Sequence, residues 1–179
     1  MNVNLIDVGL GNLSSIEHWI KECNLLSHRV KSINQFTKDP IIIPGVASAG
    51  EYMKRLANQG LDKEIIKRSM DDQKIIGICL GFQIMTHFSE EDSGVKCLGI
   101  LDGKTTYISN KGTHNGWKKI KLDSRQSEYE VFFPKKRLKL INGRVYFNHE
   151  LKVELNEDLF HQKLKNGITS FAFKKNIFE

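Results

Sequence analysis

Short apolar segments alternate with segments of helical periodicity through residue 90, and this alternation limits the possible folds more than any other feature of the sequence. The segments PIII at 40–43 and KIIGIC at 74–79 are typical of strands buried on both faces of a sheet. Because parallel strands need a long crossover, usually a helix, the alternation predicts an α/β fold with a mostly parallel central sheet flanked by helices. The expected strands are 3–7, 28–33, 40–43 and 74–79, and the expected helices are 13–23, 50–71 with a break at Gly60, and 81–88.

The pattern changes beyond Gly94, where short strands and turns replace the alternation. We expect a smaller antiparallel patch in this half of the sequence. No repeat, low-complexity tract or linker interrupts the chain, so residues 1–179 are predicted to form a single domain. The short strands are expected around 99–100, 105–108, 116–122 and 144–147.

The segment GICLGFQ at 77–83 carries the most chemical information. A buried strand delivers Cys79 into a tight turn, a glycine stands two residues away on either side, and a helix begins directly afterwards. This arrangement is typical of a nucleophile elbow, in which a strained turn exposes the nucleophile. The helix N-terminus favours the thiolate form of the cysteine, and the amide N–H of Leu80 would face a developing oxyanion. A structural cysteine in a buried strand is the alternative that the pattern leaves open.

GICLGFQ closely resembles the G-[IV]-C-x-G-[MF]-Q elbow of the class I (triad-type) glutamine amidotransferases. Further segments resemble, in the same order, one subgroup of that family, the glutaminase subunit of imidazole glycerol phosphate synthase. The similarity covers essentially the whole chain and is weakest over 118–143 and 151–166. The segments are IDVGLGN at 6–12 (resembling I-D-Y-G-x-G-N, with Val8 in place of tyrosine), IPGVA at 43–47 (L-P-G-V-G), SEE at 89–91, HNGW at 114–117 (H-x-G-W) and YFNH at 146–149 (Y-F-V-H).

The resemblance implies an enzyme in which Cys79 attacks the side-chain amide of glutamine, forms a glutamyl thioester and releases ammonia. It places Gly45 and Val46 in the loop whose backbone completes the oxyanion hole together with Leu80. It also implies that this loop rearranges when a partner binds its ligand. Ala47 stands where the family pattern has glycine, and because a Cβ disfavours positive φ, we expect the flexibility of the loop to be reduced.

The resemblance also implies a glutamine pocket. Gln83 and Glu91 would hold the substrate, Glu91 by pairing with the α-ammonium group, and a zwitterionic amino acid does need a carboxylate for its amine. His149 and Glu150 match a loop that borders the pocket, and His149 does not match the catalytic base. For Glu91 and His149, a surface position without a role in the reaction remains the alternative.

A protein partner is implied as well. Gly9, Asn12 and Trp117 match positions where the family docks its partner and borders the ammonia route. The implied partner is a (β/α)8-barrel cyclase (synthase) subunit, joined in a heterodimer, which uses the ammonia to form imidazole glycerol phosphate in histidine biosynthesis. A tryptophan buried in the core is the alternative for Trp117, and a paralogue that supplies ammonia for amidination of a surface-polysaccharide sugar is the alternative pathway.

The sequence departs from the family pattern at its C-terminus. The family's base is a histidine in a Q-F-H-P-E motif, which also supplies the glutamate that orients it, and the motif follows a strand that resembles residues 176–178. No such motif occurs within residues 1–179, and a thiol nucleophile normally needs such a base, so we expect little glutaminase activity from this chain alone. A fragment of a longer protein, an interrupted gene, and a catalytically inert homologue kept for binding its partner all remain open.

Composition limits the remaining possibilities. The formal net charge is +6, but the lysines are scattered, so a solvated basic surface fits better than a nucleic-acid footprint. The three cysteines have no metal-like spacing, and we expect no metal or cofactor and a reducing, cytoplasmic location. No apolar run approaches the roughly 20 residues of a membrane span, and the N-terminus does not resemble a signal peptide, so no membrane partner is expected.

Overall fold

The computed structural model describes residues 2–108, 114–120, 143–156, 160–163, 169–174 and 177–178. The chain divides into two compact units. The larger unit comprises Met1–Tyr107 and Leu151–Glu179, and the smaller unit comprises Ile108–Glu150. Each unit is described by itself.

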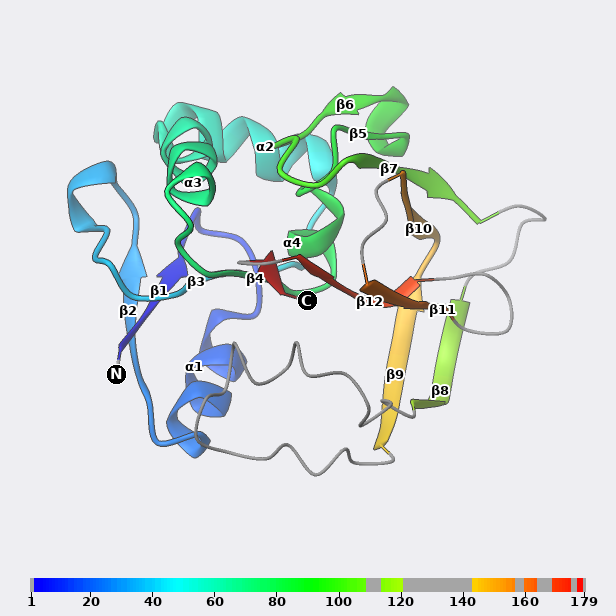
Figure 1. Ribbon diagram of the computed structural model, residues 1–179, viewed down its shortest axis with the longest axis horizontal. Coiled ribbons are helices and arrows are strands. Elements are labelled where there is room, and N and C mark those ends of the chain that lie inside the picture. Colours follow the sequence, from blue (N-terminus) through cyan, green and yellow to red (C-terminus); the bar gives the residue numbers. More distant parts are fainter. Residues whose placement is uncertain are drawn as a thin grey trace. The chain divides into compact units, whose positions relative to one another are not determined.

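A seven-stranded sheet forms the centre of the larger unit (Figure 1). The strands run in the order β11-β12-β13-β4-β3-β1-β2. From β13 to β2 every strand is parallel to its neighbours, while β12 and β11 add an antiparallel edge, so the expected α/β fold with a mostly parallel sheet is confirmed. The strands are β1 (Asn2–Ile6), β2 (Leu26–Val30), β3 (Ile41–Ile43), β4 (Ile75–Gly77), β11 (Phe160–Lys163), β12 (Thr169–Lys174) and β13 (Ile177–Phe178).

Helices cover both faces of this sheet (Figure 1). On one face α1 (Leu13–Glu22) packs against the strands, and on the other face α2 (Ala49–Asn58) and α3 (Leu61–Met70) do so. Alternate residues of β3 serve the two faces: Ile41 and Ile43 lie in the core with α2 and α3, whereas Ile42 lies in the core with α1. Because successive strand residues point to opposite faces, a strand between two helical layers must be apolar throughout.

A four-stranded sheet in the order β10-β7-β5-β6 completes the larger unit and includes the expected antiparallel patch. In it β7 (Gly103–Tyr107) is antiparallel to β10 (Leu151–Leu155) and parallel to β5 (Phe88–Ser89), and β5 is antiparallel to β6 (Val95–Lys96). Two 3-10 helices, η1 (Ile33–Gln35) and η2 (Glu91–Ser93), lie in the connections. In the smaller unit, β8 (His114–Ile120) pairs antiparallel with β9 (Gly143–His149).

The helix after the Cys79 turn is shorter than the sequence predicts. It is α4 (Leu80–Gln83), whereas a helix was expected over 81–88, and residue 88 belongs to β5. The carbonyls of Ile84 and Met85 accept hydrogen bonds from the N–H groups of Leu98 and Ile100, at 2.9 and 2.8 Å. A later segment of the chain therefore satisfies the carbonyls that a longer helix would have used.

Two strand predictions also need correction. The second strand is Leu26–Val30 rather than 28–33, because Ser32 and Gln35 form the capping box of η1 and end the extended segment early. Residues 99–100 form no strand, and Gly99 has a φ of +66°. The break predicted at Gly60 is confirmed, with a left-handed Gly60 between α2 and α3. Among the described residues, no helix is both long and apolar enough to span a membrane.

Candidate functional site at the Cys79 turn

Cys79 lies between β4 and α4 with φ +54° and ψ −112°. Positive φ is costly for a residue with a Cβ, and such strain in a non-glycine residue points to a functional constraint. The side chain is exposed, so the alternative of a cysteine buried in a strand is wrong. The structure therefore has a strained strand–turn–helix that presents a thiol to solvent at the start of a helix.

The close packing around this turn requires glycine. A Cβ on Gly81 would lie 2.0 Å from the Ile43 carbonyl oxygen, and one on Gly77 would lie 2.7 Å from the Phe82 nitrogen. The Ile78 N–H also donates to the Ile43 carbonyl at 3.0 Å. Gly81 thus lets the turn pack directly against the end of β3, and Gly77 lets β4 pack closely against α4.

The 44–48 loop, which joins β3 to α2, lies against the same turn. A Cβ on Gly45 would be 2.3 Å from the Ile78 carbonyl oxygen and 2.4 Å from the Leu80 nitrogen. As the first residue of α4, Leu80 has an N–H without an acceptor inside the helix. The structure therefore brings the Gly45 backbone beside this N–H, and the next side chain, Val46, is 63% exposed.

Ala47 is not strained in this conformation. The described non-glycine residues with positive φ are Asn24, Asp72, Cys79, Asp92 and Ser93. Because Ala47 is not among them, its Cβ carries no cost here. Reduced flexibility of the loop remains a prediction, since it concerns a different conformation.

Two carboxylates hold the end of the 44–48 loop where α2 begins. The Ala49 N–H donates to Glu91 Oε2 and the Gly50 N–H donates to Asp92 Oδ2, both at 2.8 Å. The N-cap residue of α2, Ser48, makes no side-chain capping bond. Carboxylates at a helix N-terminus satisfy orphan N–H groups and complement the helix dipole, at about 0.5–2 kcal/mol for a cap. Glu91 thus caps α2, and its role toward the substrate stays a prediction.

Gln83 lies one helical turn after Cys79 and is buried. Its N–H donates to the Cys79 carbonyl at 3.1 Å. Its own carbonyl accepts from the hydroxyls of Thr86 and Thr105, at 2.8 and 3.1 Å. These bonds fix α4 against β7, so the backbone next to Cys79 is rigidly supported.

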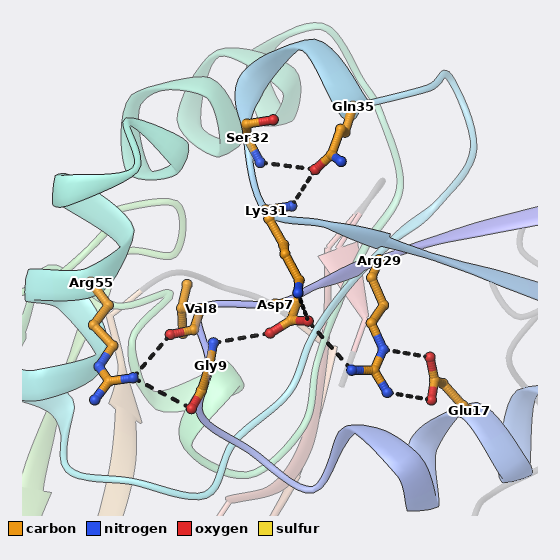
Figure 2. Close-up of polar contacts among 9 residues, drawn as sticks. All are labelled: Asp7, Val8, Gly9, Glu17, Arg29, Lys31, Ser32, Gln35 and Arg55. Carbon is orange, nitrogen blue, oxygen red and sulfur yellow. Dashed lines mark hydrogen bonds and ion pairs between the residues drawn. The ribbon is translucent and has the colours of Figure 1, made fainter.

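The loop that follows β1 is held from two sides (Figure 2). Asp7, which is buried, accepts a hydrogen bond from the Gly9 N–H at 2.9 Å, and its other oxygen lies 3.5 Å from Arg29 and 3.6 Å from Lys31. From α2, Arg55 Nη1 donates to the carbonyls of Val8 and Gly9, at 3.2 and 3.4 Å. These contacts set the loop conformation.

Gly9 and Asn12, the two residues of this loop that the sequence singles out, are exposed. Gly9 has a φ of +74°. Asn12 is the N-cap residue of α1, but its side chain makes no capping bond. Both positions are therefore open to a partner.

The other two thiols lie in different surroundings. Burial raises the pKa of the Cys97 thiol to about 11, and the charge of Glu91 adds to the rise. Cys23 is exposed in the turn after α1, away from any strand–helix elbow. In the described part of the chain, no group of three or more His, Cys, Asp or Glu side chains could hold a metal ion.

The smaller unit holds the remaining predicted residues. Trp117 is 60% exposed, so its alternative as a buried core residue is wrong. Its ring meets that of Tyr146 edge to face with centroids 5.5 Å apart, and the Arg144 guanidinium lies 5.8 Å from the Trp117 centroid. His149 lies half-buried beside the Phe147 ring, at 5.6 Å between centroids, and Glu150 is exposed.

The profile of the CobB/CobQ-like glutamine amidotransferase domain matches residues 15–138 of this chain. The chain belongs to the glutamine amidotransferase family. This is a family of enzymes, and the match spans the Cys79 turn, the 44–48 loop and Glu91.

Similarity to individual proteins covers nearly the whole of this chain, beyond the residues that the family profile matches. The imidazole glycerol phosphate synthase subunit HisH of Methanocaldococcus jannaschii is 33% identical over 181 residues, covering 98% of this chain and 87% of that protein. HisH of Buchnera aphidicola subsp. Melaphis rhois is 32% identical, covering 99% of each. HisH of Thermotoga maritima is 29% identical, covering 88% of this chain and 75% of that protein.

Solved structures share the fold of this glutamine amidotransferase. A glutamine amidotransferase crystal structure superposes with a TM-score of 0.77 at 13% identity, covering 98% of this chain and 86% of that one. A glutamine amidotransferase from Thermotoga maritima gives 0.59 at 16% identity, covering 99% of this chain and 73% of that one. At these identities the likeness supports the α/β architecture alone.

The roles of several residues around the amidotransferase site were not predicted from the sequence. Asp92 caps α2 although 42 residues separate it from Gly50. Asp7 and Arg55 fix the loop after β1 from opposite sides (Figure 2). The signal available in the sequence for Asp92 was its place directly after SEE, and for Asp7 its place at the end of an apolar strand.

Proposed function

We propose that this chain is the glutamine-hydrolysing subunit of an imidazole glycerol phosphate synthase, with Cys79 as the nucleophile. The observation that carries the proposal is an exposed Cys79 at φ +54°, with the Gly45 backbone packed beside the Leu80 N–H. The HisH relatives, which match 98% and 99% of the chain, support this synthase over other amidotransferases.

The reaction follows from this geometry. The Cys79 thiolate attacks the side-chain amide carbon of glutamine, and the carbonyl oxygen becomes an oxyanion. The Leu80 N–H and the backbone of Gly45 and Val46 stabilise that oxyanion, and one such donor is worth about 10²–10³-fold in rate. The C–N bond then breaks as the leaving nitrogen takes up the proton that the Cys79 thiol gave up, and ammonia departs. Water hydrolyses the glutamyl thioester to glutamate and restores the thiol. The base that carries this proton is not assigned to any residue within 1–179.

Polar residues close to Cys79 recognise glutamine in this proposal. Glu91 binds the α-ammonium group, because a zwitterionic amino acid needs a carboxylate for its amine and a carboxylate has several acceptor sites. Gln83 lines the pocket from α4, and a role of His149 and Glu150 in binding glutamine stays a prediction of the family resemblance. No cofactor takes part.

The ammonia passes to a (β/α)8-barrel cyclase subunit that docks through Gly9, Asn12 and Trp117 in a heterodimer. The exposure of all three supports this role. The Trp117 ring is held in place by Tyr146 and Arg144, as an interface anchor should be.

Selective labelling tests the nucleophile. The chain is treated with a diazo-ketone analogue of glutamine and the modified cysteine is found by peptide mapping, beside a Cys79→Ala control. We expect modification at Cys79, protection by glutamine, and no modification of the control. Equal labelling of Cys23, Cys79 and Cys97 without protection would refute the assignment.

A further inference from the structure

The turn that carries Asp92 has three successive residues with positive φ, and the first two are not glycine. Asp92, Ser93 and Gly94 have φ values of +53°, +66° and +104°. The Gly94 N–H donates to the Glu91 carbonyl at 2.9 Å and closes the turn. Two consecutive non-glycine residues with positive φ are unfavourable, and such strain persists only where the surrounding structure enforces it.

The strain aims the Asp92 carboxylate at the first turn of α2. Asp92 Oδ2 lies 2.8 Å from the Gly50 nitrogen, and a Cβ on Gly50 would lie only 2.7 Å from that oxygen. A glycine at this position therefore gives the carboxylate room to reach the N–H. The contact therefore depends on the positive-φ turn that carries Asp92 and on the absence of a side chain at Gly50.

We propose that Asp92 is a positioning residue that anchors the 44–48 loop for catalysis, which presumes the proposed glutaminase function. One end of this loop is fixed where Gly45 packs against the Cys79 turn. The other end leads into α2, where Glu91 and Asp92 accept from the Ala49 and Gly50 N–H groups and the buried Ala49 side chain packs in the core. Movement of α2 would therefore shift the backbone that completes the oxyanion hole.

The two carboxylates divide the work. Glu91 accepts from the Ala49 N–H and also binds the substrate ammonium. Glutamine therefore shares the carboxylate that caps α2. Asp92 holds the Gly50 N–H with a separate carboxylate, and it keeps the loop in register while Glu91 is engaged. Asp92 thus couples recognition of the substrate to the geometry around its reacting carbonyl.

Three variants isolate this role. Asp92→Ala removes the acceptor, whereas Asp92→Asn keeps an acceptor and tolerates the left-handed conformation. Asp72→Ala is the matched control, because Asp72 has nearly the same φ, +57°, in the turn after α3. A glutamine chloroketone analogue, which reacts with Cys79 through a tetrahedral oxyanion, is compared with iodoacetamide, which reacts by direct displacement.

We expect Asp92→Ala to lower the chloroketone rate at saturation by about tenfold or more, since a displacement of about 1 Å near a reacting centre can cost about 10²-fold. The half-saturating concentration and the iodoacetamide rate should change little, and Asp92→Asn and Asp72→Ala should behave like the wild type. Amide hydrogen exchange over residues 44–52 should rise in Asp92→Ala only.

Faster exchange in Asp92→Ala with an unchanged chloroketone rate would overturn the coupling, as would an equal loss in Asp72→Ala. A loss of both reagent rates would also overturn it, because the defect would then lie in Cys79 itself. Failure of the wild type to react at Cys79 would instead refute the proposed glutaminase, whatever the exchange pattern.

Discussion

Cys79 and Cys97 show how position sets the chemistry of one residue type. Cys79 is exposed at a strained turn that leads into a helix, whereas Cys97 is only 6% exposed and packs in the core. Burial favours the neutral thiol and raises the pKa of Cys97 to about 11, while a helix N-terminus favours a thiolate. An exposed thiol at the start of a helix and a buried thiol thus lie 18 residues apart in the sequence.

The raised pKa of Cys97 predicts a loss of stability in alkali. The neutral thiol contributes its full stability below the unfolded pKa near 9 and loses it as the pH rises through about 11. A shift of this size corresponds to about 2–3 kcal/mol at most. Denaturant unfolding between about pH 8 and pH 11 should show a shallower decline for Cys97→Ala than for the wild type. Cys23→Ala, at an exposed thiol, should keep the wild-type slope, and identical slopes in all three would contradict the prediction.

A buried hydroxyl gives a second prediction for a single residue. Tyr52 is fully buried in α2, and its hydroxyl has no hydrogen-bond partner in the described part of the chain. Because a buried polar group without a partner is costly, Tyr52→Phe should raise the free energy of unfolding by about 1 kcal/mol. Tyr107→Phe, at an exposed tyrosine, should change it by less than about 0.5 kcal/mol. A clear loss of stability in Tyr52→Phe would mean that the hydroxyl is satisfied.

Among the elements, those defined by local pattern could be predicted from the sequence and those defined by distant contacts could not. The all-apolar β3 and the left-handed Gly60 between α2 and α3 carry their signals within a few residues. The early end of α4 depends on hydrogen bonds from Leu98 and Ile100, which no local pattern announces. The N-terminal cap of α2 likewise comes from η2 rather than from the adjacent Ser48. The Cys79 turn was predictable, and the support around it was not.

The loop after β1 depends on α2 in a way that can be measured. Arg55→Met removes the donors to the Val8 and Gly9 carbonyls but keeps the aliphatic bulk of the side chain. We expect faster amide hydrogen exchange over residues 8–11, since loss of these bonds frees the loop locally. Glu51→Gln, which weakens the ion pair of Arg55 without removing the arginine, is the control. Unchanged exchange in Arg55→Met would show that Asp7 alone fixes the loop.

At the scale of the whole molecule, the proposed synthase requires a surface that recognises the barrel subunit. Trp117 offers a large exposed ring held by Tyr146 and Arg144. Large aromatic residues frequently carry the binding energy at protein interfaces. The barrel subunit would then be recognised through Trp117, a residue that is not part of the central sheet.

Replacement of this ring tests the partner. Trp117→Ala should weaken binding to the barrel subunit by more than about 1 kcal/mol, measured by titration calorimetry. Trp19→Ala, at a comparably exposed tryptophan on α1, is the matched control and should bind like the wild type. Equal weakening in both variants, or in neither, would exclude Trp117 as the anchor.

The parallel pairing of β13 with β4 has a practical consequence. Ile177 lies beside Ile75 and Phe178 beside Ile76, so the chain leaves β13 at the edge of the sheet where β4 passes into the Cys79 turn. β1 runs in the same direction, and its first residue, Asn2, therefore lies at the opposite edge. A label attached at Asn2, which is exposed, would therefore lie at the end of the sheet away from the Cys79 thiol.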